Sequence, residues 1–300
     1  MGTEESDALN AEVLSERRYL VSLAFRMLGT VAEAEDAAQE TYIRWYRLSP
    51  EERDAIEVPR AWLTRVASRV CLNVLDSARR RRERYVGPWL PEPVPAYAFA
   101  VSATAAEDPF EHATLDESVS TALLVVLEAM TPAERVSFVL HDVLAMPFDE
   151  IAEIVGRSSA ACRQLATSAR RRVQQDRSRH VSRAEHDDAV KAFAAAARAG
   201  DIARLIAVLD PNVVLRSDGG GIVTAARNPV VGADKVARFL FGALRKNPDA
   251  VVLDQETPDG LGFALWDEGR IIGVVTLDVA AGRVSDVRLM MNPDKLTLWN

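Results

Sequence analysis

Residues 148–172 carry the side chains with the most specific binding chemistry in this sequence. A short stretch of helical periodicity ends at Gly156, and serines then open a second helical pattern that ends in three arginines. This spacing predicts a helix-turn-helix, whose second helix places its first polar side chains in the DNA major groove. Arginine pairs with guanine, glutamine with adenine, and serine with base edges or phosphate. The candidate base-reading residues are Arg157, Ser158, Ser159, Arg163 and Gln164.

The arginines at 170–172 are candidates for phosphate contacts, which add salt-sensitive affinity without reading sequence. A plain helical hairpin with a basic exposed end is the alternative. A second basic block lies at residues 79–84, and its alternative is a solvated helix terminus favoured by the helix dipole. Two basic helical blocks separated by an acidic, proline-rich segment favour a nucleic-acid function over these alternatives.

Several helical stretches must position these side chains. Residues 12–48 show helical spacing that is interrupted at Gly29-Thr30, and residues 60–84 form a further helix after a polar loop at 49–59. Residues 113–180 return to helix. Within that stretch, a Thr-Pro-Ala-Glu run at 131–134 predicts a helix start with a capping box.

The segment between the helical stretches has a different character. Residues 85–112 hold acidic residues, no Lys or Arg, and prolines that exclude a continuous helix. The apolar run Trp89-Leu90-Pro91-Glu92-Pro93 lies inside this segment. We expect it to dock on a neighbouring domain, because a free linker has little use for a tryptophan beside a leucine. An exposed linker is the alternative.

The bulk composition limits the classes of function. The 300 residues are 48% hydrophobic and 27% charged, with a formal net charge of −8, so a wholly basic nucleic-acid binder is excluded. The two cysteines form no Cys-x-x-Cys pair, which argues against a disulfide framework or a zinc site. The polar N-terminus and the lack of an apolar run of about 18 residues predict neither a signal peptide nor a membrane span. We expect a cytoplasmic protein of two or three domains without metal or cofactor.

From about residue 187 the pattern changes to an α+β class. Helices are expected at 187–199, 201–208 and 233–245. Strands are expected at 213–215, 222–225, 251–253, 261–265, 271–277 and 284–291. We expect these strands to form a curved antiparallel sheet. Residues 187–300 contain no Tyr, His or Cys, so Asp218 is the best lone acid and the side chains of an enzyme pocket are scarce.

The order of the N-terminal motifs resembles the extracytoplasmic-function sigma factors of bacterial RNA polymerase. The run GTVAEAEDAAQETY at 29–42 and residues 59–82 resemble region 2 of that family. Residues 131–140 resemble the start of region 4, and residues 148–172 resemble its helix-turn-helix. The implied organisation is region 2 at 12–84, an acidic linker at 85–112, region 4 at 113–182 and a C-terminal domain at 186–300. Both sigma domains are expected to be all-α.

The resemblance implies promoter-specific initiation with core RNA polymerase and no catalysis by this chain. Core binding, through the β′ clamp and the β flap, would use a polar helix face, for which a solvated surface is the alternative; its residues are Glu35, Asp36, Gln39 and Glu40. The melted −10 element calls for stacking surfaces and a basic track, and the candidates are Arg60, Trp62 (alternatively a core residue), Arg65, Arg69, Asn73, Arg79 and Arg80. The −35 element would be read by Arg157, Ser158, Ser159, Arg163, Gln164, Ser168, Arg171 and Arg172.

The remaining motifs resemble the sigma subfamily that carries a SnoaL-like (NTF2-like) extension. These motifs are WLPEP at 89–93, DGGG at 218–221 and NPDKL at 292–296. Ile222 stands where such proteins usually carry a lysine, so no role of that lysine is transferred. Such a cone can be an isomerase, a hydrolase or a scaffold; we expect a non-catalytic regulatory module, with an unidentified small ligand or residual chemistry as the alternative. The regulatory contact would join Trp89, Leu90, Pro91, Glu92 and Pro93 to Asp218, Gly219, Gly220 and Gly221.

Two other classes of protein are weighed against this interpretation. A one-component helix-turn-helix regulator with a ligand-sensing NTF2-like domain explains residues 148–300 but leaves residues 12–84 without a task. An enzyme with an accessory DNA-binding region conflicts with the scarcity of pocket side chains after residue 187.

Overall fold

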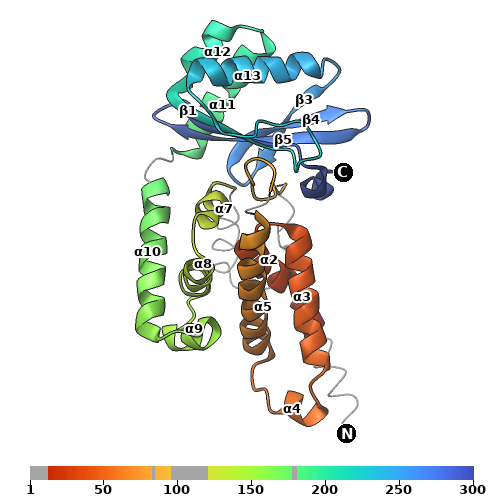
Figure 1. The fold of residues 1–300 in the computed structure, drawn as a ribbon, viewed down its shortest axis with the longest axis vertical. Helices are drawn as coiled ribbons and strands as arrows, with labels where there is room; N and C mark the ends of the chain where they lie inside the picture. The colour runs from red at the N-terminus through yellow and green to blue at the C-terminus, as the bar shows by residue number, and fades with distance from the viewer. Residues whose placement is uncertain (1–12, 83–84, 96–120, 178–180) are drawn as a thin grey trace. The chain divides into compact units, whose positions relative to one another are not determined.

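The computed structural model describes residues 13–82, 85–95, 121–177 and 181–300 (Figure 1). The chain divides into two compact units. The N-terminal unit is drawn from Met1–Arg81 and Leu127–Arg171, and the C-terminal unit from Arg82–Val126 and Arg172–Asn300. Each unit is described by itself below.

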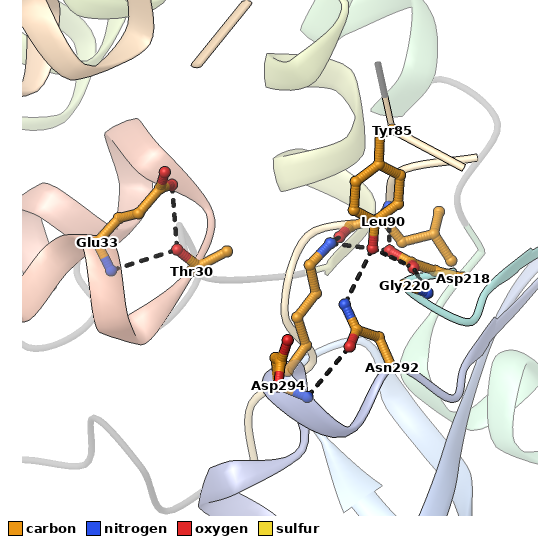
Figure 2. Close-up of polar contacts among 9 residues, drawn as sticks. Thr30, Glu33, Tyr85, Leu90, Asp218, Gly220, Asn292 and Asp294 are labelled. Atoms are coloured by element: carbon orange, nitrogen blue, oxygen red, sulfur yellow. Dashed lines mark hydrogen bonds and ion pairs between the residues drawn. The ribbon is translucent and has the colours of Figure 1, made fainter. Parts of the chain in front are cut away.

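Four helices build the first part of the N-terminal unit: α2 (Arg17–Leu28), α3 (Val31–Tyr46), α4 (Pro50–Asp54) and α5 (Pro59–Arg82). The predicted break between α2 and α3 is confirmed. Gly29 ends α2 with a left-handed φ of 81°, a conformation that glycine adopts at little cost. Thr30 then caps α3 by accepting a hydrogen bond from the Glu33 amide, at 3.4 Å (Figure 2).

The segment predicted as a polar loop at 49–59 contains the short helix α4. Its start satisfies every local rule: Ser49 and Glu52 form a capping box, and Pro50 occupies the first turn. The helix buries none of its side chains, so hydrophobic periodicity could not reveal it.

Helices α7 (Thr121–Glu128), α8 (Pro132–Phe138), α9 (Phe148–Val155) and α10 (Ser159–Arg177) follow. The predicted capping box at the start of α8 is confirmed, because Thr131 and Glu134 bond to each other's backbone amides. A π-helical turn, η1 (Val139–Val143), continues α8. None of the described helices is long and apolar enough to cross a membrane.

The C-terminal unit packs α11 (Arg183–Arg198), α12 (Ile202–Val208) and α13 (Ala233–Lys246) on one face of a six-stranded sheet (Figure 1). The strands are β1 (Leu209–Asp218), β2 (Val230–Val231), β3 (Val251–Thr257), β4 (Gly260–Asp267), β5 (Arg270–Ala280) and β6 (Arg283–Met290), in the order β2-β1-β6-β5-β4-β3. Side chains such as Val190, Phe193, Val236, Phe263 and Leu277 form the core between helices and sheet.

Two details of the predicted sheet are wrong. The sheet is mixed, because β1 pairs parallel to β6 while the pairs β3–β4, β4–β5 and β5–β6 are antiparallel. Residues 222–225 form no strand. Gly220 and Gly221 have left-handed φ values of 65° and 74°, which turn the chain away from the sheet, and Ile222 is 65% exposed.

Candidate nucleic-acid interface

Helices α9 and α10 form the predicted helix-turn-helix. Gly156 ends α9 in the left-handed conformation, with φ 69°, and Ser158 accepts a hydrogen bond from the Ala161 amide at 3.2 Å to open α10. Ile151 and Ile154 are the buried residues of α9. The buried face of α10 consists of Cys162, Ala166, Ala169 and Val173. Local capping and this apolar seam therefore fix how the second helix is presented.

The turn before α10 and the outward side of α10 carry part of the predicted −35 set. Arg157, Arg163, Gln164 and Arg171 are exposed. The guanidinium of Arg163 lies 5.2 Å from the centroid of the Phe148 ring, so a cation–π contact supports this side chain. These residues are available to a major groove.

Two serines of the predicted −35 set donate hydrogen bonds to acidic side chains of neighbouring helices. The Ser159 hydroxyl donates to Asp149, and the Ser168 hydroxyl donates to Glu134 Oε1 at 3.1 Å. Arg170, a predicted phosphate contact, is ion-paired with Asp142 at 2.7 Å. The placement of Ser168 does not support its predicted contact with DNA, because its hydroxyl holds α10 against α8.

The predicted −10 residues lie along helix α5. Arg60 lies over the Tyr19 ring, 4.2 Å from its centroid, and Trp62 is half-buried in an edge contact with Trp45, with 5.3 Å between ring centroids. Trp62 thus serves partly as a core residue and keeps part of its ring exposed. Asn73 is exposed. The side chains of Arg79 and Arg80 lie outside the described residues.

Arg65 and Arg69 contact the helix-turn-helix within the N-terminal unit. Arg65 Nη2 lies 2.7 Å from Glu150 Oε2, and Arg69 Nη2 donates to the Glu153 carbonyl at 3.1 Å. Both acceptors belong to α9. Two arginines of the predicted −10 set are therefore engaged by the first helix of the helix-turn-helix.

The predicted polymerase-binding face lies on α3. Glu35, Asp36 and Gln39 are exposed and Glu40 is half-buried. Glu35 pairs with Arg17 at 3.1 Å, and Glu40 pairs with Arg44 at 2.9 Å. Exposed pairs of this kind contribute little and exchange readily, so the face remains accessible to a basic partner helix.

Arg135 is a structural residue whose role the sequence did not reveal. Its side chain is 2% exposed. It donates to the carbonyls of Met27 at 2.7 Å and Leu127 at 2.9 Å and pairs with Glu128 at 2.5 Å. One buried guanidinium thus joins the end of α2 to the α7–α8 corner.

Asp218 organises a second site, inside the C-terminal unit (Figure 2). Its carboxylate is fully buried and accepts hydrogen bonds from Tyr85 Oη at 2.5 Å, Leu90 N at 3.0 Å and Gly220 N at 3.0 Å. Lys295 Nζ lies 2.8 Å from Oδ2 of the same carboxylate. We call Tyr85, Leu90, Asp218, Asn292 and Lys295 the linker clamp.

The clamp holds three segments that are distant in sequence. Lys295 also donates to the Leu90 carbonyl at 2.6 Å, and Asn292 donates to Tyr85 Oη at 3.0 Å. Beside them, Trp299 Nε1 donates to the Pro93 carbonyl at 2.8 Å. The structure therefore brings Leu90 and Asp218 together as predicted, and Glu92 and Pro93 are buried. It adds Tyr85, Asn292 and Lys295. The NPDKL motif indicated Asn292 and Lys295, whereas no motif indicated Tyr85.

Neighbouring atoms leave no room for a side chain at two positions of the triple glycine, Gly219 and Gly220. A Cβ on Gly219 would lie 2.2 Å from the Val223 carbonyl oxygen, and one on Gly220 would lie 2.5 Å from Asn292 Cγ.

Burial and the hydrogen bond to Asp218 raise the pKa of Tyr85, so its phenol stays protonated and donates. Lys295 lies 4.0 Å from the centroid of the Trp89 ring, which adds a cation–π contact.

The two helical regions each match a protein-family model. The family model Sigma-70 region 2 matches residues 13–82, and Sigma-70, region 4 matches residues 120–173. The chain belongs to the extracytoplasmic-function (ECF) RNA polymerase sigma factors. Residues 13–82, which a one-component regulator would leave without a task, are thereby assigned, and that alternative is not favoured.

Relatives that match over nearly the whole chain show how far the likeness extends. The chain is 39% identical to ECF RNA polymerase sigma factor SigJ of Mycobacterium tuberculosis, over 94% of this chain and 91% of the relative. It is 35% identical to "Probable ECF RNA polymerase sigma factor SigI" of the same species, over 97% and 96%. The crystal structure of the M. tuberculosis SigJ protein superposes with a TM-score of 0.71 and 35% identity, over 96% of this chain and 98% of that chain. The likeness therefore includes the α+β extension.

Proposed function

We propose that this sigma factor grips a promoter with two elements. The exposed residues of α10 read the −35 element in the major groove, and α5 with the loop before it holds the melted −10 strand. The single observation that carries this proposal is the α9–α10 helix-turn-helix, in which Arg157 of the turn and Arg163 and Gln164 of the capped second helix are exposed. Arginine and glutamine are the side chains that recognise guanine and adenine edges.

Core polymerase would be held by two surfaces. The face of Glu35, Asp36, Gln39 and Glu40 suits a basic partner helix, which we assign to the β′ clamp. Region 4 would meet the β flap. Support for the first assignment comes from the exposure of three of these four residues and from the weakness of the surface ion pairs that compete for them.

The C-terminal unit would regulate this activity through the linker. Residues 85–112 connect the two DNA-binding regions along the chain, and the clamp fixes Tyr85 and Leu90 on the C-terminal unit. A fixed linker restricts the separations that the two regions can reach. Docking and undocking of this segment would therefore tune promoter use without a separate regulatory protein.

A chemical step in the C-terminal unit is not part of this proposal. Asp218, the predicted lone acid, is fully buried and paired with Lys295, so it is not poised to take a proton from a substrate. A general base must reach the proton that it abstracts. We assign the extension a regulatory role.

Run-off transcription with purified core polymerase and a cognate promoter tests the DNA-reading part. Gln164→Ala should lower promoter-specific output about tenfold through loss of a bidentate base contact. Gln174→Ala, at an exposed position further along α10, is the matched control and should leave output unchanged. Equal output from both variants would contradict the assignment of Gln164.

The polymerase-binding part has its own test. Asp36→Lys should weaken binding to core polymerase, measured by fluorescence anisotropy of labelled sigma factor. Asp188→Lys reverses a charge at an exposed position of α11 and should bind as the wild type does. Unchanged core affinity for Asp36→Lys would remove α3 from the interface.

A further inference from the structure

The C-terminal unit contains a cavity of about 730 Å³ between α11, α13 and the sheet face that these helices cover. This volume lies within the roughly 300–1,000 Å³ of small-molecule sites. The walls of the cavity are mostly apolar. They include Phe193, Phe239, Leu240, Phe263, Val275 and Leu289.

Charged side chains line part of the same cavity. The titratable lining residues, among the described part of the chain, are Lys246, Asp267 and Arg270. Lys246 and Arg270 are exposed and Asp267 is half-buried, so these groups lie toward solvent and carry a net positive charge. Aromatic and aliphatic walls with a positive rim suit a molecule that has an apolar body and one acidic group.

One wall of the cavity is shared with the linker. Leu296 and Ile271 line the cavity, and the same two side chains pack in the small apolar cluster that contains Leu90. Leu296 follows Lys295 directly, and Lys295 holds the Leu90 carbonyl. A molecule that shifts Leu296 therefore acts on the apolar seat and on the polar anchor of the linker together.

We propose that this cavity binds a small amphipathic carboxylate or sulfonate, and that Leu296 transmits its presence to the docked linker. The apolar body lies among the phenylalanines, and the acidic group lies near Lys246 and Arg270. The binding part stands apart from the proposed function, whereas the transmission part rests on the proposed regulatory role of the linker.

Gly242 offers a variant that occupies part of the cavity, at a position with open space for a side chain. It lines the cavity from α13, and a Cβ added there meets no atom within 4 Å. Replacing a helical glycine also improves helix propensity. Gly242→Phe therefore places a ring in the cavity, and Gly242→Ala is the matched control that adds only a methyl group. Far-UV circular dichroism and the melting temperature verify both variants.

Binding is measured on the full-length protein by fluorescence with 8-anilinonaphthalene-1-sulfonate, followed by displacement with dodecanoate, dodecanol and dodecyltrimethylammonium. We expect dye affinity to fall about tenfold in Gly242→Phe and to stay unchanged in Gly242→Ala. Dodecanoate should displace the dye at about fivefold lower concentration than the cation or the alcohol. Equal dye affinity in Gly242→Phe would overturn the site, and equal displacement by the three amphiphiles would overturn the acidic group.

Hydrogen exchange of residues 85–95 tests the transmission. Saturating dodecanoate should change the exchange rate of the Leu90 amide in the wild type and leave it unchanged in Gly242→Phe. Binding with no change at Leu90 would overturn the transmission while leaving the site in place. Because neither readout involves transcription, failure here is distinguishable from failure of the proposed regulation.

Discussion

Lys295 and Asp218 form an ion pair in which Nζ and Oδ2 are 2.8 Å apart and the side chains are 7% and 0% exposed. Burying two charges is costly unless their remaining hydrogen-bonding capacity is also satisfied. Leu90 meets this need from both sides, because its amide donates to Asp218 and its carbonyl accepts from Lys295. The hydrogen-bonding groups of both side chains are therefore fully paired only when the linker is docked.

Lys295→Met should destabilise the C-terminal unit by about 3–5 kcal/mol, because it leaves the Asp218 carboxylate buried without its cation. The double variant with Asp218→Asn should recover part of this loss, since no charge then remains buried. Urea unfolding measures both. Lys191→Met, at an exposed position, is the control, and a loss no larger than that of the control would refute a structural ion pair.

Tyr85→Phe should cost about 2–3 kcal/mol at neutral pH, because it removes the hydrogen bond to the buried Asp218 carboxylate and the acceptor of the Asn292 amide. Burial and the hydrogen bond to Asp218 raise the pKa of Tyr85 above 10.0. The contribution of Tyr85 is then complete below pH 10.0 and is lost as the pH rises through its folded-state pKa. The difference in unfolding free energy between wild type and Tyr85→Phe should shrink above pH 10. A difference that is constant with pH would argue against this hydrogen bond, and Tyr46→Phe is the exposed control.

Glu150→Gln should release Arg65 for DNA with little loss of stability. Their side chains are 34% and 45% exposed, and such pairs contribute about 0–1 kcal/mol. We expect holoenzyme to bind a −10 single-stranded oligonucleotide more tightly. Glu153→Gln is the matched control, because Arg69 contacts the backbone carbonyl of Glu153 and not its side chain. The same gain in both variants would show that the effect comes from the loss of a negative charge and not from the release of Arg65.

Gly156→Ala should destabilise the helix-turn-helix by about 1–2 kcal/mol. The cause is conformational, since φ is 69° and a Cβ at this position meets no atom within 4 Å. Gly156→Asn should cost less, because asparagine tolerates the left-handed region better than alanine. Urea unfolding distinguishes the two variants, and equal losses would point to a cause other than backbone strain.

Much of the helical part of this protein follows from sequence alone. The capping box of Thr131 and Glu134, the end of α9 at Gly156 and the opening of α10 at Ser158 depend on groups within a few residues of each other. Local signals of this kind survive in a single sequence, and the order of the motifs indicated the family. The helix α4 was not predicted, because it buries no side chain and therefore gives no hydrophobic periodicity.

Tertiary structure decided which distant groups meet. The parallel pairing of β1 with β6 depends on strands from opposite ends of the sheet-forming segment. Tyr85 meets Asp218 across 133 residues of chain, and Lys295 meets it across 77. Periodicity and spacing do not encode such contacts, because the donors to the Asp218 carboxylate come from distant segments. These donors meet Asp218 only when folding buries it beside them. The sequence by itself determined the sigma regions and the motif residues; the folded chain determined that a buried carboxylate holds the linker.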